Sequence, residues 1–167
     1  VDTERIDGIA VQREENETFT LIYVARLIEL KRHSMLFDAM REVPGLKLRL
    51  VGYGPLEEEL RKEAEGLDVE FIGAMPRDQV YEELKQADSY VSASSYEGLP
   101  IGVLEAMRCG LPCLLSDIEQ HREIAEECRG LILCPDDCWR EALKQLKGTG
   151  REELKNIECR LSKLEKQ

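Results

Sequence analysis

The sequence has few of the features that mark nucleic-acid-binding and membrane proteins. Its 167 residues carry a formal net charge of −11, and the basic residues form no stripe along the chain. Because phosphate backbones require a basic surface, we expect no nucleic-acid partner. No segment contains the roughly 18 consecutive apolar residues of a membrane-spanning helix, so we also expect no transmembrane segment.

Metal-binding and secretory patterns are missing as well. None of the six cysteines forms a C-x-x-C pair, and neither His33 nor His121 lies at a zinc-type spacing from a cysteine pair. We expect no metal ion, and reduced cysteines that pack as small apolar side chains. The charged segment 1–16 has no apolar stretch of the signal-peptide kind. These absences indicate a cytoplasmic protein, in solution or peripheral to the inner face of a membrane.

Two common catalytic motifs are absent. There is no G-x-x-x-x-G-K-[ST], which excludes a P-loop nucleotidase, and no G-x-S-x-G nucleophile elbow. Gly52 and Gly54 form a G-x-G, but the third glycine of a dinucleotide-binding fingerprint does not follow. The two glycines would let the backbone approach a ligand, but a G-x-G alone is a weak signal.

Apolar runs of strand length alternate with amphipathic segments of helix length. Strands are predicted at residues 19–26, 46–52, 69–73, 89–94, 112–116 and 130–134. Helices are predicted at residues 32–43, 55–66, 76–87, 100–110, 118–128 and 138–148. The last of these is expected to be capped by Asp136 or Asp137. The alternation predicts an α/β fold, a Rossmann-like doubly wound parallel sheet of about six strands with helices on both faces.

The same pattern divides the chain. Residues 1–18 are polar and aperiodic and are interpreted as an interdomain linker, residues 19–150 as the domain, and residues 151–167 as a charged C-terminal helix. In sheets of this kind, ligands bind beyond the carboxyl ends of the strands. We therefore expect the functional residues in the turns that follow the strands.

The turn after the first predicted strand, ARLIELK, places Arg26 and Lys31 in an otherwise acidic chain. Arg supplies a planar fork of donors and Lys a point charge, a combination suited to a diphosphate. The alternative is an Arg that caps the strand end and a Lys on the surface. Both interpretations fit this stretch.

The turn after the fourth predicted strand opens SYEGLPIGVLEAMRCGLP, residues 95–112, which contains Glu97 and Glu105. Gly98 permits a sharp turn, and Pro100 begins the helix. Amide groups near residues 99–102 are expected to point outward at the positive helix end, which favours an anion. A carboxylate close to phosphate is repelled, so both glutamates are expected to face neutral groups such as sugar hydroxyls. For Glu97 the alternative is a solvated charge favoured by the helix dipole.

Five motifs in this order resemble the C-terminal domain of the retaining GT-B glycosyltransferases of family 4, or group 1. They are VDTERI (1–6), ARLIELK (25–31), LRLVGYGP (48–55), FIGAMP (71–76) and EGLPIGVLEAMRCGLP (97–112). The last resembles the family's signature of two glutamates with seven residues between them. The resemblance extends from Val1 to about Lys147, nearly the whole chain.

The resemblance implies a hexosyltransferase that takes a UDP-, GDP- or ADP-sugar and transfers the hexose to a glycan or lipid. Glu97 would contact the donor sugar, and Arg26 and Lys31 would stabilise the leaving diphosphate, so these three are expected to be catalytic. Glu105 would bind the ribose. The other donor-binding residues that the family implies are Gly54, Ile72, Gly73, Met75, Gly98, Leu99, Pro100, Ile101, Gly102 and Leu104. No metal is implied, because the two cations neutralise the diphosphate.

The chain departs from the family pattern in three places. Ala25 replaces the usual glycine before the Arg, and Arg32 stands where glycine is common after the Lys. The loop SDIEQHREI (116–124) lacks the paired glycines of some members, so no binding role is carried over to it, and His121 is not expected to be a ligand.

Whole enzymes of this type have an N-terminal acceptor domain, which this chain lacks. We therefore expect the chain alone to bind donor without transferring sugar. Two alternatives remain at this stage. One is a nucleotide-binding regulatory domain without transfer activity, which the intact pair of glutamates argues against. The other is an NAD-binding domain, which the missing third glycine argues against.

Overall fold

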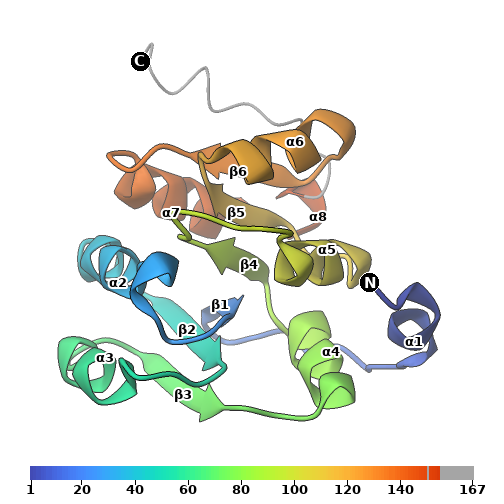
Figure 1. Cartoon of the computed structure of the whole chain (residues 1–167), viewed down its shortest axis with the longest axis horizontal. Helices are drawn as coiled ribbons and strands as arrows, with labels where there is room; N and C mark the ends of the chain where they lie inside the picture. The colour runs from blue at the N-terminus through green and yellow to red at the C-terminus, as the bar shows by residue number, and fades with distance from the viewer. Residues whose placement is uncertain (150, 155–167) are drawn as a thin grey trace.

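The structure is a computed structural model that describes residues 1–149 and 151–154, and it shows a parallel sheet between two layers of helices (Figure 1). The strands are β1 (Phe19–Val24), β2 (Leu46–Val51), β3 (Val69–Gly73), β4 (Ser89–Ser92), β5 (Cys113–Ser116) and β6 (Leu131–Cys134). The helices are α1 (Thr3–Gly8), η1 (Glu29–Lys31), α2 (His33–Arg41), α3 (Glu57–Glu63), α4 (Arg77–Gln86), α5 (Ile101–Arg108), α6 (Glu119–Glu127), α7 (Trp139–Gly148) and α8 (Arg151–Leu154).

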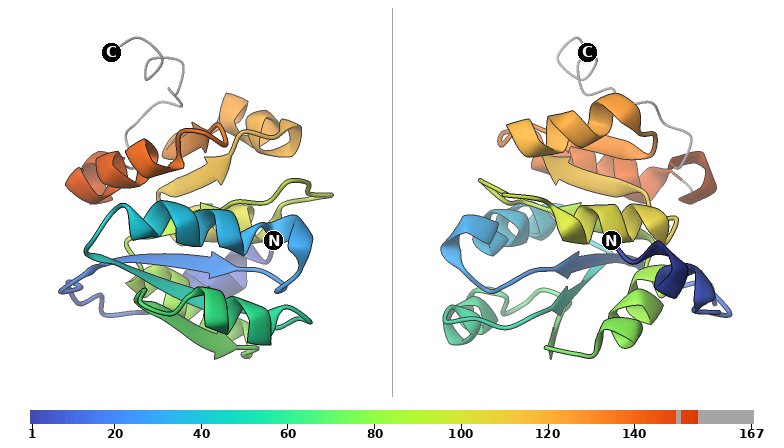
Figure 2. Two further views of the ribbon diagram at one scale, coloured as in Figure 1. Left: turned by 90° about the vertical axis from the view of Figure 1, so that its left-hand side faces the viewer. Right: turned by 45° about the vertical axis from the view of Figure 1, so that its right-hand side comes forward.

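The six strands have the order β3-β2-β1-β4-β5-β6, and every neighbouring pair is parallel. Helices α2, α3 and α7 cover one face of the sheet, while α4, α5 and α6 cover the other (Figures 1 and 2). The strand order reverses its direction at β1 and β4, which is the switch point of a doubly wound sheet. The predicted Rossmann-like fold is confirmed.

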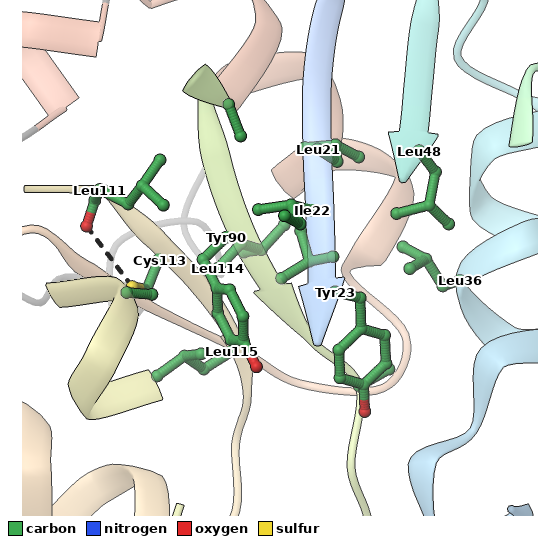
Figure 3. Packing of buried hydrophobic residues seen from close by; sticks show 14 of the residues in the cluster. Leu21, Ile22, Tyr23, Leu36, Leu48, Tyr90, Leu111, Cys113, Leu114 and Leu115 are labelled. Carbon is green, nitrogen blue, oxygen red and sulfur yellow. Dashed lines mark hydrogen bonds between the residues drawn. The ribbon is translucent and has the colours of Figure 1, made fainter. Parts of the chain in front are cut away.

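The central strands form the core because the sheet buries both of their faces. Leu21, Ile22 and Tyr23 of β1 are at most 1% exposed, and all four residues of β4 and of β5 are buried (Figure 3). A strand covered on both faces has no polar side to alternate with, which explains the continuous apolar runs in the sequence. Two tyrosines extend this core toward the carboxyl edge, where Tyr23 and Tyr90 meet edge to face at 6.4 Å.

The strands and helices predicted between residues 19 and 148 are all present, with ends at or slightly inside the predicted ranges, but one predicted cap is wrong. Helix α7 begins at Trp139, and its N-cap is Cys138, which makes no side-chain cap hydrogen bond. Asp136 instead accepts a hydrogen bond from the Arg32 guanidinium at 2.9 Å. The expected cap was therefore lost to a partner that is distant in the sequence.

The N-terminal segment is more structured than its polar composition suggested. Thr3–Gly8 forms helix α1, which lies against α4 and α5 and buries Ile6 completely. Lys85 of α4 donates to the carbonyl oxygens of Ile6 and Ile9, at 2.7 and 2.6 Å. A helix of six residues with one buried apolar side chain shows no hydrophobic periodicity, so the sequence pattern did not predict it. That residues 1–18 link two domains stays a prediction.

Further contacts fasten the same segment beyond α1. Arg13 forms an ion pair with the mostly buried carboxylate of Asp88, and the Asn16 amide donates to the Gln86 carbonyl at 2.9 Å. These contacts hold the segment along α4 as far as the start of β1. At the other end of the chain, helix α8 covers Arg151–Leu154, and the rest of the predicted C-terminal helix lies outside the described residues.

Candidate functional site

The loops that follow β1 to β4 converge at the carboxyl edge of the sheet. The Leu27 amide donates to the Tyr53 carbonyl at 2.9 Å, which joins the loops after β1 and β2. The Gly52 amide donates to the Gly73 carbonyl at 2.9 Å, and the Ser95 amide donates to the Leu30 carbonyl at the same distance. The structure thus brings the predicted residues of four separate turns to one edge.

The two glycines after β2 are required by the protein's own backbone. A Cβ atom on Gly52 would lie 1.9 Å from the Ala25 carbonyl oxygen, and one on Gly54 would lie 2.4 Å from that of Leu27. Gly52 also has a φ of +134°, which side-chain-bearing residues rarely adopt. The G-x-G therefore serves close packing of two loops, and the donor contact expected of Gly54 stays a prediction.

Lys31 and Glu97 meet directly. Lys31 ends η1, and its Nζ donates to Glu97 Oε1 at 2.6 Å, with only 18% and 14% of the two side chains exposed. The Lys31 backbone is held by Tyr23, whose hydroxyl donates to the Lys31 carbonyl at 3.0 Å. Arg26, by contrast, is exposed at the end of β1. The two predicted cations are thus in different states, one paired and one open to solvent.

The residue after Lys31 explains one departure from the family pattern. Arg32 has a φ of +49° and is the one non-glycine residue with positive φ in the described part of the chain. Glycine adopts this left-handed conformation without strain, whereas other residues lose about 1–2 kcal/mol. Arg32 offsets this cost with two hydrogen bonds, to the Ala93 carbonyl at 2.7 Å and to Asp136.

The turn into α5 carries several of the residues predicted to bind the donor, and the expectation that its amides point outward is wrong for Ile101. Pro100 is the N-cap of α5, while Leu99 and Ile101 are 67% and 43% exposed. The Ile101 amide does not point outward, because it donates to the Leu99 carbonyl at 2.8 Å in a tight turn. Gly102 is packed closely: a Cβ there would lie 2.6 Å from the Tyr90 hydroxyl.

Glu105 is buried where α5 packs against α4, with 2% of the residue exposed. The Tyr81 hydroxyl donates to Glu105 Oε1 at 3.1 Å, and Arg77 Nη1 donates to Oε2 at 3.4 Å. Burial and the Glu105 carboxylate raise the pKa of Tyr81, which keeps the phenol a donor. The expectation that Glu105 faces only neutral groups is wrong, because the guanidinium of Arg77 stabilises its charge.

Arg77 and Tyr81 were missed because nothing in their own segment marks them. They lie four residues apart at the start of α4 and so share one face of the helix. The signal was in Glu105 itself, since a carboxylate in an apolar helix needs hydrogen-bond donors from a neighbouring element. Only the packing of α4 on α5 identifies those donors.

The predicted base-contacting residues lie at the end of β3. Ile72, Gly73 and Met75 are half-buried there, at the outer strand of the sheet. Leu104 is half-buried on α5, one residue before Glu105. Met75 lies two residues before Arg77, the residue at which α4 begins.

Both histidines are buried. His121 is fully buried, and its Nδ1 donates to the Ser116 carbonyl at 2.8 Å. His33 is 2% exposed, with its ring centroid 5.0 Å from that of Tyr23, and burial together with Lys31 lowers the pKa of His33 to about 4. Within residues 1–149 and 151–154, no group of three or more His, Cys, Asp or Glu side chains is arranged to hold a metal ion.

A cavity of about 460 Å³ opens between α2 and α3 on the far face of the sheet from Glu105. His33, Leu56 and Leu60 contribute to its lining, and none of the residues predicted to bind a donor does so. No helix in the described part of the chain is long and apolar enough to cross a membrane.

Comparisons with known proteins place this geometry in a family. Residues 5–156 match the family model "Glycosyl transferases group 1". The chain is 32% identical to the putative glycosyltransferase EpsF of Bacillus subtilis (strain 168), covering 94% of this chain and 42% of that protein. It is 30% identical to lipopolysaccharide 1,6-galactosyltransferase of Escherichia coli (strain K12), covering 68% of this chain and 34% of that protein.

Solved structures agree with the fold. The apo form of the lipopolysaccharide outer core galactosyltransferase WaaB superposes with a TM-score of 0.72 at 24% identity, over 87% of this chain and 43% of that one. Anabaena HepE in complex with UDP and glucose superposes with a TM-score of 0.66 at 20% identity, over 83% and 42%. The chain thus spans less than half the length of these proteins. It belongs to the glycosyl transferases group 1 family and has the Rossmann-like fold of a GT-B domain.

Proposed function

We propose that this chain is the donor-binding half of a retaining glycosyltransferase of family 4, which transfers a hexose from a nucleotide diphosphate sugar to a glycan or lipid acceptor. The observation that carries the proposal is the carboxyl edge of the sheet. There Lys31 and Glu97 are paired at the entrance to α5, and Glu105 is buried two turns further along the chain.

The diphosphate is assigned to the cationic side of this edge. Exposed Arg26 supplies a fork of donors, and Lys31, paired with Glu97 in the loop before α5, supplies a second charge. Both would stabilise the negative charge that develops on the leaving nucleoside diphosphate. Because Lys31 is paired with Glu97 in this structure, the phosphate oxygens must share it or replace the carboxylate.

The two glutamates are assigned to hydroxyl groups. Glu105, already oriented by two donors, is assigned to the ribose, and Glu97 to the donor hexose. Support for a hexose and for UDP comes from relatives and neighbours, among them the galactosyltransferase of E. coli and HepE, whose structures contain UDP and glucose or UDP-glucose. Arg26 and Lys31 would neutralise the diphosphate without a metal ion, so chelation by EDTA is expected to leave donor binding unchanged.

A ligand panel tests the donor assignment. UDP, GDP, ADP, their glucose forms and NAD are each added to the chain in a thermal-shift assay. A bound ligand at a hundred times its Kd adds about 2.7 kcal/mol of stability. Stabilisation by a nucleoside diphosphate and by its sugar form supports the proposal. Stabilisation by NAD alone indicates a dinucleotide-binding domain, and no stabilisation by any of them contradicts the donor assignment.

The phosphate assignment is tested by Arg26→Ala and Lys31→Ala. Each should weaken nucleoside diphosphate binding by about 1.5–3 kcal/mol and leave nucleoside binding unchanged, as expected for a charged hydrogen bond. Lys47→Ala is the matched control, because Lys47 also pairs with a glutamate, Glu70, but at the pair of strands β2 and β3. Equal losses for nucleoside and diphosphate would show that the two cations do not hold phosphate.

Transfer itself needs an acceptor oxygen within about 3–3.5 Å of the anomeric carbon, and we assign that side of the cleft to an N-terminal acceptor domain. The chain alone is then expected to bind donor and to transfer no sugar. A longer chain that carries the acceptor domain should transfer sugar to a glycan or lipid extract from the cytoplasm or the inner face of the membrane. Equal turnover by the two chains would place the acceptor site within these 167 residues. Donor binding without turnover by either chain would favour a regulatory nucleotide-binding domain.

A further inference from the structure

We propose that Tyr81 is a positioning residue that prepares Glu105 for the ribose, with Arg77 stabilising the same carboxylate from the open side. The inference rests on the proposed function, because it assigns Glu105 to the ribose. It concerns residues on α4, an element to which no donor contact has been assigned.

The two oxygens of Glu105 have different surroundings. Oε1 accepts from the hydroxyl of Tyr81, which is 2% exposed, and Oε2 accepts from Arg77, whose side chain is 49% exposed. Tyr81 is therefore fixed by packing, whereas Arg77 lies at the surface. Since the phenol cannot move without disturbing the core, it holds Glu105 in one rotamer, and the guanidinium supports the negative charge of that rotamer.

The remaining hydrogen-bonding capacity fits a vicinal diol. An ionised carboxylate offers about four acceptor positions on its two oxygens, and Tyr81 and Arg77 use one position on each. About two positions then remain, one on each oxygen. The 2′- and 3′-hydroxyls of a ribose supply two donors at the matching separation. A carboxylate free to rotate would lose this match, which is why the orientation of Glu105 matters for ribose recognition.

Ribose discrimination measures this role directly. UDP, GDP and ADP are each compared with their 2′,3′-dideoxy counterparts in binding to the full chain, using calorimetry. The unmodified chain should prefer the ribose form by about tenfold or more, as expected for hydroxyl bonds to a charged acceptor. Tyr81→Phe should reduce this preference by at least about threefold, while the dideoxy nucleotides bind as before.

Two further variants separate positioning from loss of packing. Val80→Ala shortens a buried side chain of the same helix, so it should lower the stability of the chain and keep the ribose preference. In a Glu105→Gln background, Tyr81→Phe should have no further effect on the preference, because its action runs through that carboxylate.

The possible results distinguish a failure of the inference about Tyr81 from a failure of the proposed function. If the unmodified chain binds nucleotides with a ribose preference and Tyr81→Phe keeps that preference in full, the inference is overturned and the proposed function stands. The same holds if Val80→Ala and Tyr81→Phe reduce the preference equally. If the unmodified chain binds none of the nucleotides, the proposed function and the inference both fail.

Discussion

The two glutamates of one motif, Glu97 and Glu105, are held in opposite ways. Glu97 lies in a loop, where its partner is Lys31, a flexible cation. Glu105 lies in a helix with 3% of its side chain exposed, and its partners are a buried phenol and a guanidinium. Glu97 is thus held by one lysine, whereas Glu105 is held by two donors from a packed helix. Under the proposed function, the Lys31–Glu97 pair must be shared or opened when the diphosphate binds, whereas Glu105 is oriented before the ribose arrives.

The largest effect on ligand binding is expected when Glu105, the glutamate held by two donors, is replaced. Glu105→Gln replaces one acceptor oxygen by a donor group and should weaken all nucleotides by about 1.5–3 kcal/mol, since the ribose is common to them. Binding of UDP, GDP and ADP by calorimetry measures the change. Inorganic diphosphate is the control, because it has no ribose and should bind equally to both proteins. A loss confined to nucleotide sugars would reverse the roles of the two glutamates.

The stability of the folded protein should depend on pH through His33, which lies two residues after Lys31. The pKa of His33 is about 4 in the folded protein, against roughly 6.5 in an unfolded chain. The unfolded state therefore takes up this proton first as the pH falls, and stability decreases below pH ~6.5 until the folded state is protonated near pH ~4. This group should contribute a loss of about 2 kcal/mol by pH 5.

The variant His33→Phe keeps an aromatic ring beside Tyr23 and removes the titration. The free energy of unfolding is measured with urea at pH 7.5, 6 and 5. As the pH falls, it should decrease less for the variant than for the unmodified protein. A difference that stays constant across this range would show that His33 does not take up a proton preferentially on unfolding.

A smaller effect is expected from the strained residue beside the ion pair. Arg32→Gly and Arg32→Ala both lose the hydrogen bonds to Ala93 and Asp136, but only the glycine relieves the left-handed conformation. Urea unfolding should find the glycine variant more stable than the alanine variant by about 1 kcal/mol. Equal stabilities would mean that the loop changes conformation when the Arg is removed.

The smallest effect on ligand binding is expected at Glu97, the glutamate paired with Lys31. Glu97→Gln releases Lys31 from a mostly buried ion pair, so free UDP should bind equally well or up to about threefold more tightly. Nucleotide sugars should lose this advantage, because Glu97 is assigned to the sugar. Calorimetry with UDP and UDP-glucose gives both numbers. Equal weakening of the two ligands would show that Glu97 serves the nucleotide and would remove the contrast with Glu105.

Local sequence patterns were sufficient to predict the strands and helices of the domain. They were insufficient to predict helix α1 and the N-cap of α7. The buried runs of β1, β4 and β5 were readable because strands covered on both faces lack polar alternation. Helix α1 was not predicted, because its one buried side chain, Ile6, is covered only through the contacts of α1 with α4 and α5, and its Ile6 carbonyl is bound by Lys85 of α4. Asp136 or Asp137 was expected to cap α7, but neither does, and Asp136 instead pairs with Arg32, 104 residues away in the sequence.

The sequence by itself determined which turns come together at the candidate site. Alternating strands and helices require a parallel sheet, and a parallel sheet brings the turns after its strands to one edge, so Arg26, Lys31 and Glu97 had to lie there. Only the tertiary structure decided the partners. Lys31 and Glu97 are 66 residues apart, and Tyr81 and Glu105 are 24 apart, on the helices α4 and α5 that pack against each other. Such pairs leave no hydrophobic periodicity and no local motif in the sequence. A buried carboxylate needs hydrogen-bond donors, and these come from the element that the fold packs beside it.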